Sequence, residues 1–423
     1  MNQWSTKDKS AVWHPNISQW QKALNITITR AEGASIFDTD GNRYLDMCAS
    51  EGVTLHGHCD PRIAEAIREQ VLSFSQTIYQ GFTHQPSVEL AEALLQLLPT
   101  HQAKVLFSTD HNSSIEIALK IALQYDLNRH QPSHTFLVFE DCFHGNFLAS
   151  ILPKFLQVIP GNFSNSAYKI KTIPLPDSEN IARILKKIET THQESPITAF
   201  VFEPLVLFQG GMKMYKAEFL EKLLFRCQQL GITTIADESY TAFGRLGSMF
   251  ACDYIETQPD IFCLSNGLTG GVLPLGVTTC SSKIYHLFLK KDAQNTFYHT
   301  QAYPANALAC TAANASLNIF KQPNYIDEIV RIIFKHQAFA AYLKDEKKVN
   351  NVRQTGTLLA FDIAVDTSGI KEPISDYLIS TAIRNGVILG RINNTIYLAP
   401  PYCITNSELD YAYTVLHQIL KIL

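Results

Sequence analysis

The sequence has no excess of charge of either sign. Its 423 residues include 35 Lys and Arg against 39 Asp and Glu, a formal net charge of −4. A protein that binds nucleic acid through its phosphates needs basic side chains gathered on one surface. No segment of this chain concentrates Lys and Arg, and we therefore expect no nucleic-acid partner.

Long apolar runs and paired cysteines are also missing. Nowhere do about 18 apolar residues follow one another, so no membrane-spanning helix is predicted. The polar residues 1–9 contain no apolar run of the signal-peptide type. The nine cysteines are scattered without a Cys-x-x-Cys pair, which argues against a disulfide framework or a zinc site. These absences predict a cytoplasmic protein with no membrane partner.

What is present is a large supply of apolar residues in alternating patterns. Hydrophobic residues make up 46% of the chain, enough for a large core and two domains. Short β-rich runs alternate with stretches of helical period, such as residues 115–128 and 217–230. The runs are residues 105–107, 135–139, 199–202, 233–236 and 261–264. This alternation predicts an α/β fold, with a mostly parallel sheet covered by helices.

The two ends of the chain differ from its middle. Residues 25–47 have the pattern of a small antiparallel meander with a turn at Asp40 and Gly41. After residue 320, helical stretches alternate with short strands. We expect the two ends to pack together as a smaller α/β domain. The predicted division is 1–55 for its N-terminal part, 56–320 for the large domain and 321–423 for its C-terminal part.

Two segments in the middle of the chain follow predicted strands. Residues 236–247 read A-D-E-S-Y-T-A-F-G-R-L-G, and residues 265–271 read S-N-G-L-T-G-G. Ligands of open α/β sheets lie at the carboxyl ends of strands, so both segments belong to a candidate site. They resemble the two diagnostic motifs of class III aminotransferases, which use pyridoxal phosphate (PLP). In that family the acidic residue, here Asp237, pairs with the pyridine nitrogen of PLP, and a lysine at the position of Asn266 forms the Schiff base.

The resemblance extends over nearly the whole chain. It is nearest to the branch that contains diaminopelargonic acid aminotransferase, an enzyme of biotin synthesis. It implies a fold-type-I PLP-transferase that forms a homodimer, with residues 306–320 in the interface. Further matches lie at residues 13–15, 56–58, 143–145, 203–204, 210–212, 306–310 and 395–401.

The resemblance assigns several residues to the cofactor ring. Phe143 and His144 would stack on its face, and Asp237 would hold the ring nitrogen charged. Ser239 is a further cofactor-binding candidate. A core aromatic beside a hydrogen-bonded histidine explains Phe143 and His144 equally well. For Asp237, the alternative is a carboxylate that caps a turn.

The phosphate cradle departs from the family pattern, which has a Ser-Gly-Ser/Thr turn before a helix. His111 stands at the glycine position, where a Cβ obstructs close backbone approach, and Asn112 stands at the hydroxyl position. Asp110 adds negative charge beside a dianion. Asn112 and Ser113 remain cofactor-binding candidates, although a helix-capping role explains them better. The hydroxyl that the family takes from the neighbouring subunit corresponds to Ala302, so the expected binding of PLP or pyridoxamine phosphate (PMP) is weakened.

The catalytic amine is absent. The amide nitrogen of Asn266 is not nucleophilic, so this side chain can neither form an imine nor act as a base. Removing a nucleophile of this kind lowers a rate by about a million-fold. Lys283, Lys290 and Lys291 lie in a later predicted element, and nothing in the sequence indicates that one of them replaces the missing lysine.

The substrate side differs as well. The family branch has a tyrosine at the position of Asn16 and an aromatic pair at the positions of Glu51 and Gly52. Glu51 and Gly52 remain the substrate-side candidates there. The carboxylate-binding arginine of the branch falls at Gly390, and Arg391, one residue later, is the third candidate. A shift of one residue along a strand turns a side chain to the other face.

Three functional hypotheses follow, in order of preference. In the first, the chain is a pseudoenzyme that has lost transamination and keeps the fold and the homodimer as a binding scaffold. In the second, it is an enzyme with reworked chemistry that uses PLP or PMP non-covalently or binds another ligand. Its acid and base candidates would be Glu51, His111, His144 and Asp237. In the third, it is an aminotransferase in which another lysine supplies the amine.

Overall fold

A seven-stranded sheet forms the centre of the computed structural model, which describes residues 3–14, 26–131, 133–144, 169–289, 296–364 and 374–423. Its order is β4-β12-β11-β10-β7-β5-β6. Neighbours from β11 to β6 are parallel, whereas β12 is antiparallel to β11 and β4. The strands are β4 (Gln102–Ser108), β5 (Thr135–Phe139), β6 (Lys169–Ile173), β7 (Ile197–Phe202), β10 (Thr233–Asp237), β11 (Ile261–Leu264) and β12 (Gly276–Ser281). The mostly parallel α/β sheet predicted from the sequence is confirmed.

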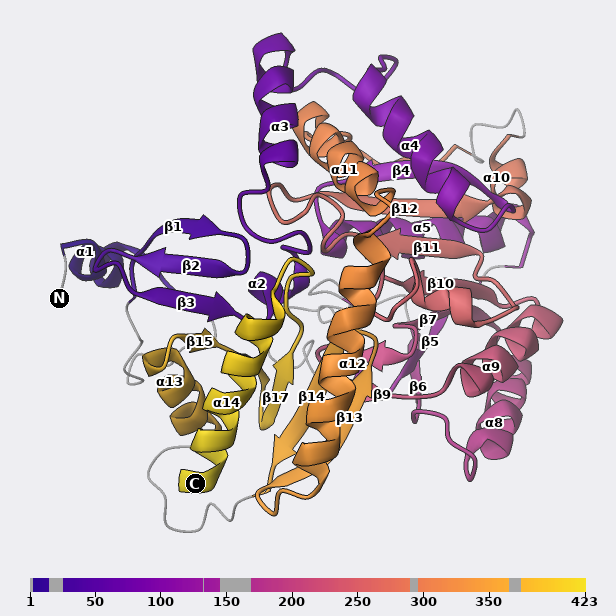
Figure 1. Cartoon of the computed structure of the whole chain (residues 1–423). Coiled ribbons are helices and arrows are strands. Elements are labelled where there is room, and N and C mark those ends of the chain that lie inside the picture. Colours follow the sequence, from indigo (N-terminus) through magenta and orange to yellow (C-terminus); the bar gives the residue numbers. More distant parts are fainter. Residues whose placement is uncertain (1–2, 15–25, 132, 145–168, 290–295, 365–373) are drawn as a thin grey trace.

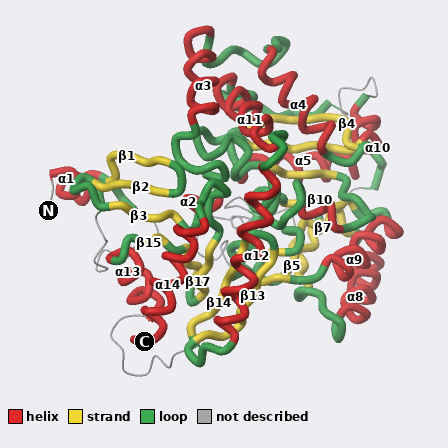
Figure 2. Tube along the Cα trace, viewed as in Figure 1, coloured by secondary structure: helices red, strands yellow, loops and turns green. Residues whose placement is uncertain are grey.

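Helices cover both faces of this sheet (Figures 1 and 2). In β7, Phe200 and Phe202 pack into one core and Ala199 and Val201 into another, as the two-residue period of a strand requires. The apolar side of α9 (Ala217–Leu230) joins the first core, and α5 (His111–Asn128) joins the second. Further helices near the sheet are α4 (Gln85–Leu97), α8 (Ile181–Glu194) and α10 (Ser282–Phe288).

Residues from both chain ends share one small sheet, in the order β1-β2-β3-β15. Its strands are β1 (Ile28–Glu32), β2 (Ser35–Asp38), β3 (Arg43–Asp46) and β15 (Val387–Ile388). The first three form the predicted antiparallel meander, and β15 runs parallel to β3. The two ends thus pack together as expected, while the exact domain boundaries stay a prediction.

A second four-stranded sheet completes the C-terminal part, with the order β13-β14-β17-β16. Its strands are β13 (Val349–Thr355), β14 (Leu358–Ile363), β16 (Gly390–Ile392) and β17 (Thr395–Leu398). The helices of this part are α12 (Tyr325–Lys344), α13 (Ile374–Arg384) and α14 (Asn406–Ile422). In this sheet β17 lies between β14 and β16, and Gly390 is paired with Tyr397; Figure 1 shows β17 beside β14.

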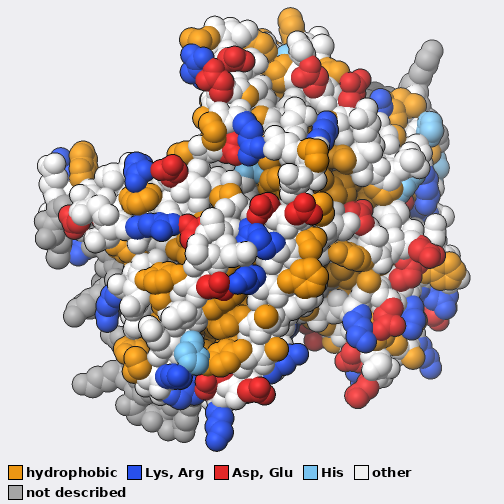
Figure 3. Space-filling model, viewed as in Figure 1, with side chains coloured by type: hydrophobic (Ala, Val, Ile, Leu, Met, Phe, Trp, Pro, Cys, Tyr) orange, Lys and Arg blue, Asp and Glu red, His pale blue; other side chains and the backbone are white. Residues whose placement is uncertain are grey.

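The outer elements include α3 (Pro61–Ser73) and α11 (Ala307–Phe320), which lie side by side (Figures 1 and 2). On the face drawn in Figure 3, acidic and basic side chains are interspersed, as the small net charge suggested. Within the described part of the chain, no helix has both the length and the apolar character needed to cross a membrane.

Candidate functional site

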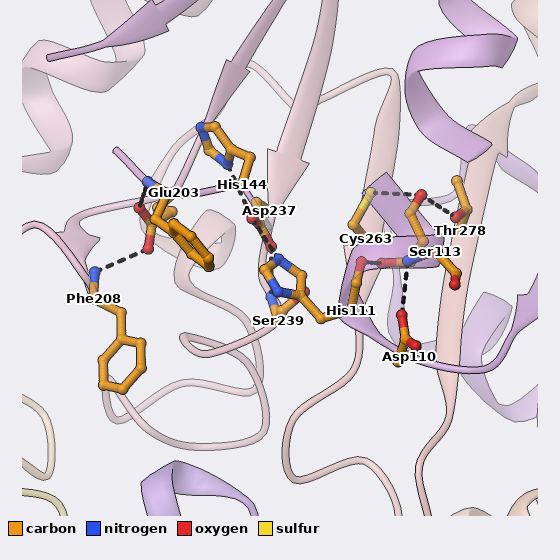
Figure 4. A network of polar contacts seen from close by, with 12 residues as sticks. Asp110, His111, Ser113, His144, Glu203, Phe208, Asp237, Ser239, Cys263 and Thr278 are labelled. Atoms are coloured by element: carbon orange, nitrogen blue, oxygen red, sulfur yellow. Dashed lines mark hydrogen bonds and ion pairs between the residues drawn. The ribbon is translucent and has the colours of Figure 1, made fainter. Parts of the chain in front are cut away.

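Asp237 is the last residue of β10, at the carboxyl edge of the parallel strands, and only 3% of its side chain is exposed. Its Oδ2 atom accepts two hydrogen bonds, from Nε2 of His111 at 2.9 Å and from Nδ1 of His144 at 3.0 Å. Its Oδ1 accepts the backbone N–H of Ser239 at 3.3 Å. Figure 4 shows the two imidazoles converging on this carboxylate from different elements. Both oxygens of Asp237 are therefore engaged by the protein itself.

Charge pairing controls the protonation of this cluster. Burial alone would raise the pKa of Asp237, but His111 and His144 outweigh it and hold that pKa far below its usual range. Burial alone would lower the pKa of His111, yet the Asp237 carboxylate raises it overall. The pKa of His144 is raised well above its usual value against its burial, through Cys142 and Asp237. A carboxylate between two imidazolium groups is the state these shifts favour.

His111 reaches Asp237 because it is the first residue of α5. The helix is capped by the side chain of Asp110, whose Oδ1 accepts the backbone N–H of Ser113 at 2.8 Å. The expectation that Asn112 and Ser113 supply the cap is thus wrong: Ser113 donates, and the acceptor is Asp110. The hydroxyl of Ser113 instead lies 3.2 Å from that of Thr109.

This arrangement does not fit the PLP that the resemblance implies. At the Oδ2 atom of Asp237, a PLP ring nitrogen would compete with two histidine donors that already occupy the usual acceptor directions of that oxygen. The phosphate would have to approach the start of α5, where the Asp110 carboxylate accepts the helix N–H instead. The cofactor ring would therefore meet His111, and the phosphate would meet the carboxylate of Asp110.

His144 and Phe143 lie at the end of the described segment 133–144. His144 is fully buried and bonded to Asp237, as the alternative of a hydrogen-bonded core histidine proposed. The backbone N–H of Phe143 donates to Oε1 of Glu203 at 3.4 Å, and that of Phe208 donates to Oε2 at 2.9 Å. Burial raises the pKa of Glu203 to about 7. Gly145, the third residue of the predicted motif, lies outside the described residues.

Asn266 lies in the turn that follows β11. Ser265 donates its hydroxyl to the carbonyl of Leu275 at 2.8 Å, and Gly267 has a φ of +83°. No lysine is buried among the described residues, and Lys283 is exposed on α10. Within that part of the chain, no lysine is thus enclosed in the interior as a replacement for the amine that Asn266 lacks. Lys290 and Lys291 lie outside the described residues.

Tyrosine rings fill the substrate side where two glycines leave space. A Cβ on Gly52 would lie 2.3 Å from the ring of Tyr240, and one on Gly390 would lie 2.1 Å from the ring of Tyr397. Phe208 stacks on Tyr240 with ring centroids 3.7 Å apart and meets Tyr397 edge-on at 5.7 Å. The positions that hold an aromatic residue and an arginine in the family branch are here covered by rings from other elements.

The remaining described candidates differ in their relation to this ring cluster. Arg391 lies away from it, whereas Glu51 is close enough that, after burial, its charge contributes to the raised pKa of Tyr240 and Tyr397. Arg391 is exposed on β16 and bonds to Asp376 of α13, while its neighbours Gly390 and Ile392 are buried. Strand alternation thus turns Arg391 outward towards Asp376, and its substrate-side role stays a prediction. Glu51 is exposed in a left-handed conformation, with φ +62°. Asn16 lies outside the described residues.

Ala302 is exposed in the loop before α11, and its carbonyl accepts a weak bond from Gln76 at 3.5 Å. No side-chain hydroxyl is therefore presented at this position. Three features of the site were missed from the sequence: the bond between His111 and Asp237, and the ring positions of Tyr240 and Tyr397. A histidine at a glycine position was the one available signal for the first.

Comparisons with known proteins agree with this fold and these motifs. The family model described as aminotransferase class-III matches residues 16–420. The adenosylmethionine-8-amino-7-oxononanoate aminotransferase of Synechococcus elongatus is 34% identical over 417 residues, which cover 97% of this chain and 98% of that protein.

Two solved structures of aminotransferases have the same fold as this chain. That of the adenosylmethionine-8-amino-7-oxononanoate aminotransferase of Methanocaldococcus jannaschii superimposes with a TM-score of 0.89 at 28% identity, over 99% of this chain and 98% of the other. An amine transaminase of an uncultivated Pseudomonas species, in its PLP-bound internal-aldimine form, gives 0.87 at 25% identity, over 97% and 98%.

Proposed function

The chain belongs to the class III aminotransferase family, and from that membership we propose that it keeps the family's fold without lysine-dependent transamination. The observation that carries this proposal is Asn266, which stands after β11 where the family's Schiff-base lysine belongs. Fold alone does not give activity, since activity depends on the site.

The chemistry of the site supports this proposal. Transamination on PLP requires an amine that holds the cofactor and moves a proton, and an amide side chain does neither. The burial of the ring nitrogen's partner, Asp237, beneath two histidines points the same way. The chain then acts as a scaffold or binds a ligand other than a covalently held cofactor.

A second candidate function is aminotransfer of the diaminopelargonate type. It is favoured by the identity of 34% with the Synechococcus elongatus relative over nearly the whole of both chains. It requires a lysine from outside the described residues, such as Lys290 or Lys291, to take the role of the missing one.

Absorption spectroscopy separates the two candidates. The protein is purified with PLP present, desalted and scanned in the visible range before and after treatment with borohydride. The proposed function predicts no band that borohydride removes and no transfer of an amino group from adenosylmethionine to 8-amino-7-oxononanoate. A reducible band together with transfer would establish the second candidate instead.

We also propose that the chain forms a homodimer. Exposed apolar side chains gather where α3 ends and the loop before α11 passes: Leu72, Ile78, Phe82 and Tyr303 are 79%, 70%, 63% and 59% exposed. The side-chain amide of Asn306 donates to the carbonyl of Ser75 at 3.1 Å, which holds the two segments together. Exposed apolar side chains on two neighbouring segments favour burial against a second copy.

A further inference from the structure

We propose that the His111 imidazole occupies the position at which the family's cofactor presents its ring nitrogen, and that this side chain is the main determinant of PLP exclusion. The inference rests on the proposed function for its setting, because it concerns the same site. The exclusion of PLP is assigned here to His111 and not to the missing lysine.

The hydrogen bond from His111 to Asp237 resembles the one that a cofactor ring nitrogen would make. His111 Nε2 and a protonated pyridine nitrogen have the same need, an anionic acceptor in line with an N–H bond. The imidazole meets that need at 2.9 Å from Oδ2 of Asp237. His144 fills the second acceptor direction of the same atom at 3.0 Å, from a fully buried position. A ligand nitrogen can therefore reach this oxygen only when His111 leaves.

Of the two histidines bonded to Asp237, His111 is the one able to move away. The side chain of His111 is 21% exposed, whereas that of His144 is 0% exposed. His111 also belongs to the turn at the start of α5, where the family has a glycine with no side chain to project. One added side chain at this position thus both fills the ring site and satisfies the carboxylate.

Other changes in the site weaken cofactor binding without occupying the ring position. Asp110 places its carboxylate at the start of α5, where it caps the helix through Ser113. Asn266 removes the covalent link but leaves space, since an amide is shorter than a lysine side chain. These two residues provide the comparisons that test whether His111 is decisive.

The test titrates PLP into variants and follows the visible band and its loss on borohydride treatment. Asn266→Lys supplies the amine, and we expect it alone to form the band only at high PLP concentration. Asn266→Lys with His111→Gly should reach half-saturation at a PLP concentration lower by about tenfold or more. Asn266→Lys with Asp110→Ser should change the half-saturation of Asn266→Lys by less than about threefold.

His130→Gly is the matched control for the loss of an imidazole. His130 is exposed just beyond the other end of α5, and its φ of +59° suits glycine. Combined with Asn266→Lys, it should bind PLP no better than Asn266→Lys alone. If Asn266→Lys binds as well as its combination with His111→Gly, or if Asp110→Ser opens the site equally, the inference is overturned.

Two measurements keep the inference testable if His111→Gly does not fold. His111→Ala replaces it in the same series, and without any added lysine it should gain thermal stability with PMP, which the unchanged protein should not. In the unchanged protein, the ¹⁵N signals of His111 should not move when PMP is added. Movement at micromolar PMP would show that the ligand displaces the imidazole freely, and would overturn the inference. A reducible band in the unchanged protein would instead refute the proposed function.

Discussion

Asp237 is a carboxylate buried at the end of a strand. A buried charge needs a partner charge and hydrogen bonds, since its desolvation is otherwise too costly. In a PLP enzyme the cofactor supplies the cation, whereas here His111 and His144 supply it from the chain. The charge of Asp237 is thus paired within the chain, which lets the residue persist without its inherited task. Among the described residues, Nε2 of His144 and Oγ of Ser239 are buried without a hydrogen-bond partner.

This pairing predicts a pH-dependent contribution to stability. The raised pKa of His111 means that its stabilisation is fully present below its unfolded pKa of 6.5 and is lost as pH rises through its folded pKa. His111→Gln keeps a donor but loses the charge, and should cost on the order of 1–3 kcal/mol at low pH. Denaturant unfolding of both proteins between about pH 5.5 and 9 measures the difference. The difference should shrink as pH rises; a constant difference would mean that folding does not raise the pKa of His111.

A second prediction at the residue scale concerns Gly390. An added Cβ would lie 2.1 Å from the Tyr397 ring, so Gly390→Ala should destabilise the protein by about 1–3 kcal/mol through forced displacement of the ring. Combining it with Tyr397→Leu frees the space, and the double variant should lose less stability than the two single changes added together. Strict additivity in urea unfolding would show that the ring does not fill this position.

At the scale of elements, α5 shows what the sequence could and could not predict. Its apolar period placed a helix at residues 115–128, but the helix begins at His111, because Asp110 caps a polar turn that has no apolar pattern. The predicted strand at residues 233–236 correctly placed Asp237 at the end of β10. The contact between Asp237 and His111 could not be predicted, because packing of α5 against the sheet sets it.

The same reasoning applies to the glycines of the substrate side. Gly52 and Gly390 were interpreted as lost side chains, and the sequence offered no sign of what would take their space. Tyr240 takes the space at Gly52 from a distant segment, whereas Tyr397 faces Gly390 as its cross-strand partner in the β16–β17 hairpin. By contrast, the strands of the central sheet were predictable, since β5, β7 and β11 are buried along their whole length and appear as largely apolar runs.

The cap of α5 leads to a prediction for that element. Asp110→Ala removes the acceptor of the Ser113 N–H and should lower the free energy of unfolding by about 0.5–2 kcal/mol. Asp110→Asn keeps a capping oxygen and should lose only a small part of that stability. Thermal or urea unfolding of the two variants decides the matter, and equal losses would show that the charge of Asp110, and not its capping bond, stabilises the helix start.

At the scale of the whole molecule, the proposed homodimer would bury the surface formed by Leu72, Ile78, Phe82 and Tyr303. Leu72→Glu with Phe82→Glu places two charges in that surface and should weaken dimerisation by about a hundredfold or more. Phe225→Glu, on the exposed side of α9, introduces the same chemistry elsewhere and should leave the dimer intact. Light scattering across a dilution series measures the assembly. A monomeric unchanged protein, or equal effects of both sets of changes, would contradict the proposed interface.

The same dimer variants separate assembly from cofactor chemistry. Family members receive a phosphate-binding hydroxyl from the neighbouring subunit, and the corresponding Ala302 has none to offer. If a second copy serves only to bury apolar surface, Leu72→Glu with Phe82→Glu should lower the melting temperature while leaving any response to PMP unchanged. Calorimetry with and without PMP tests this, because a dimer that still built a cofactor site would lose its PMP response together with its assembly.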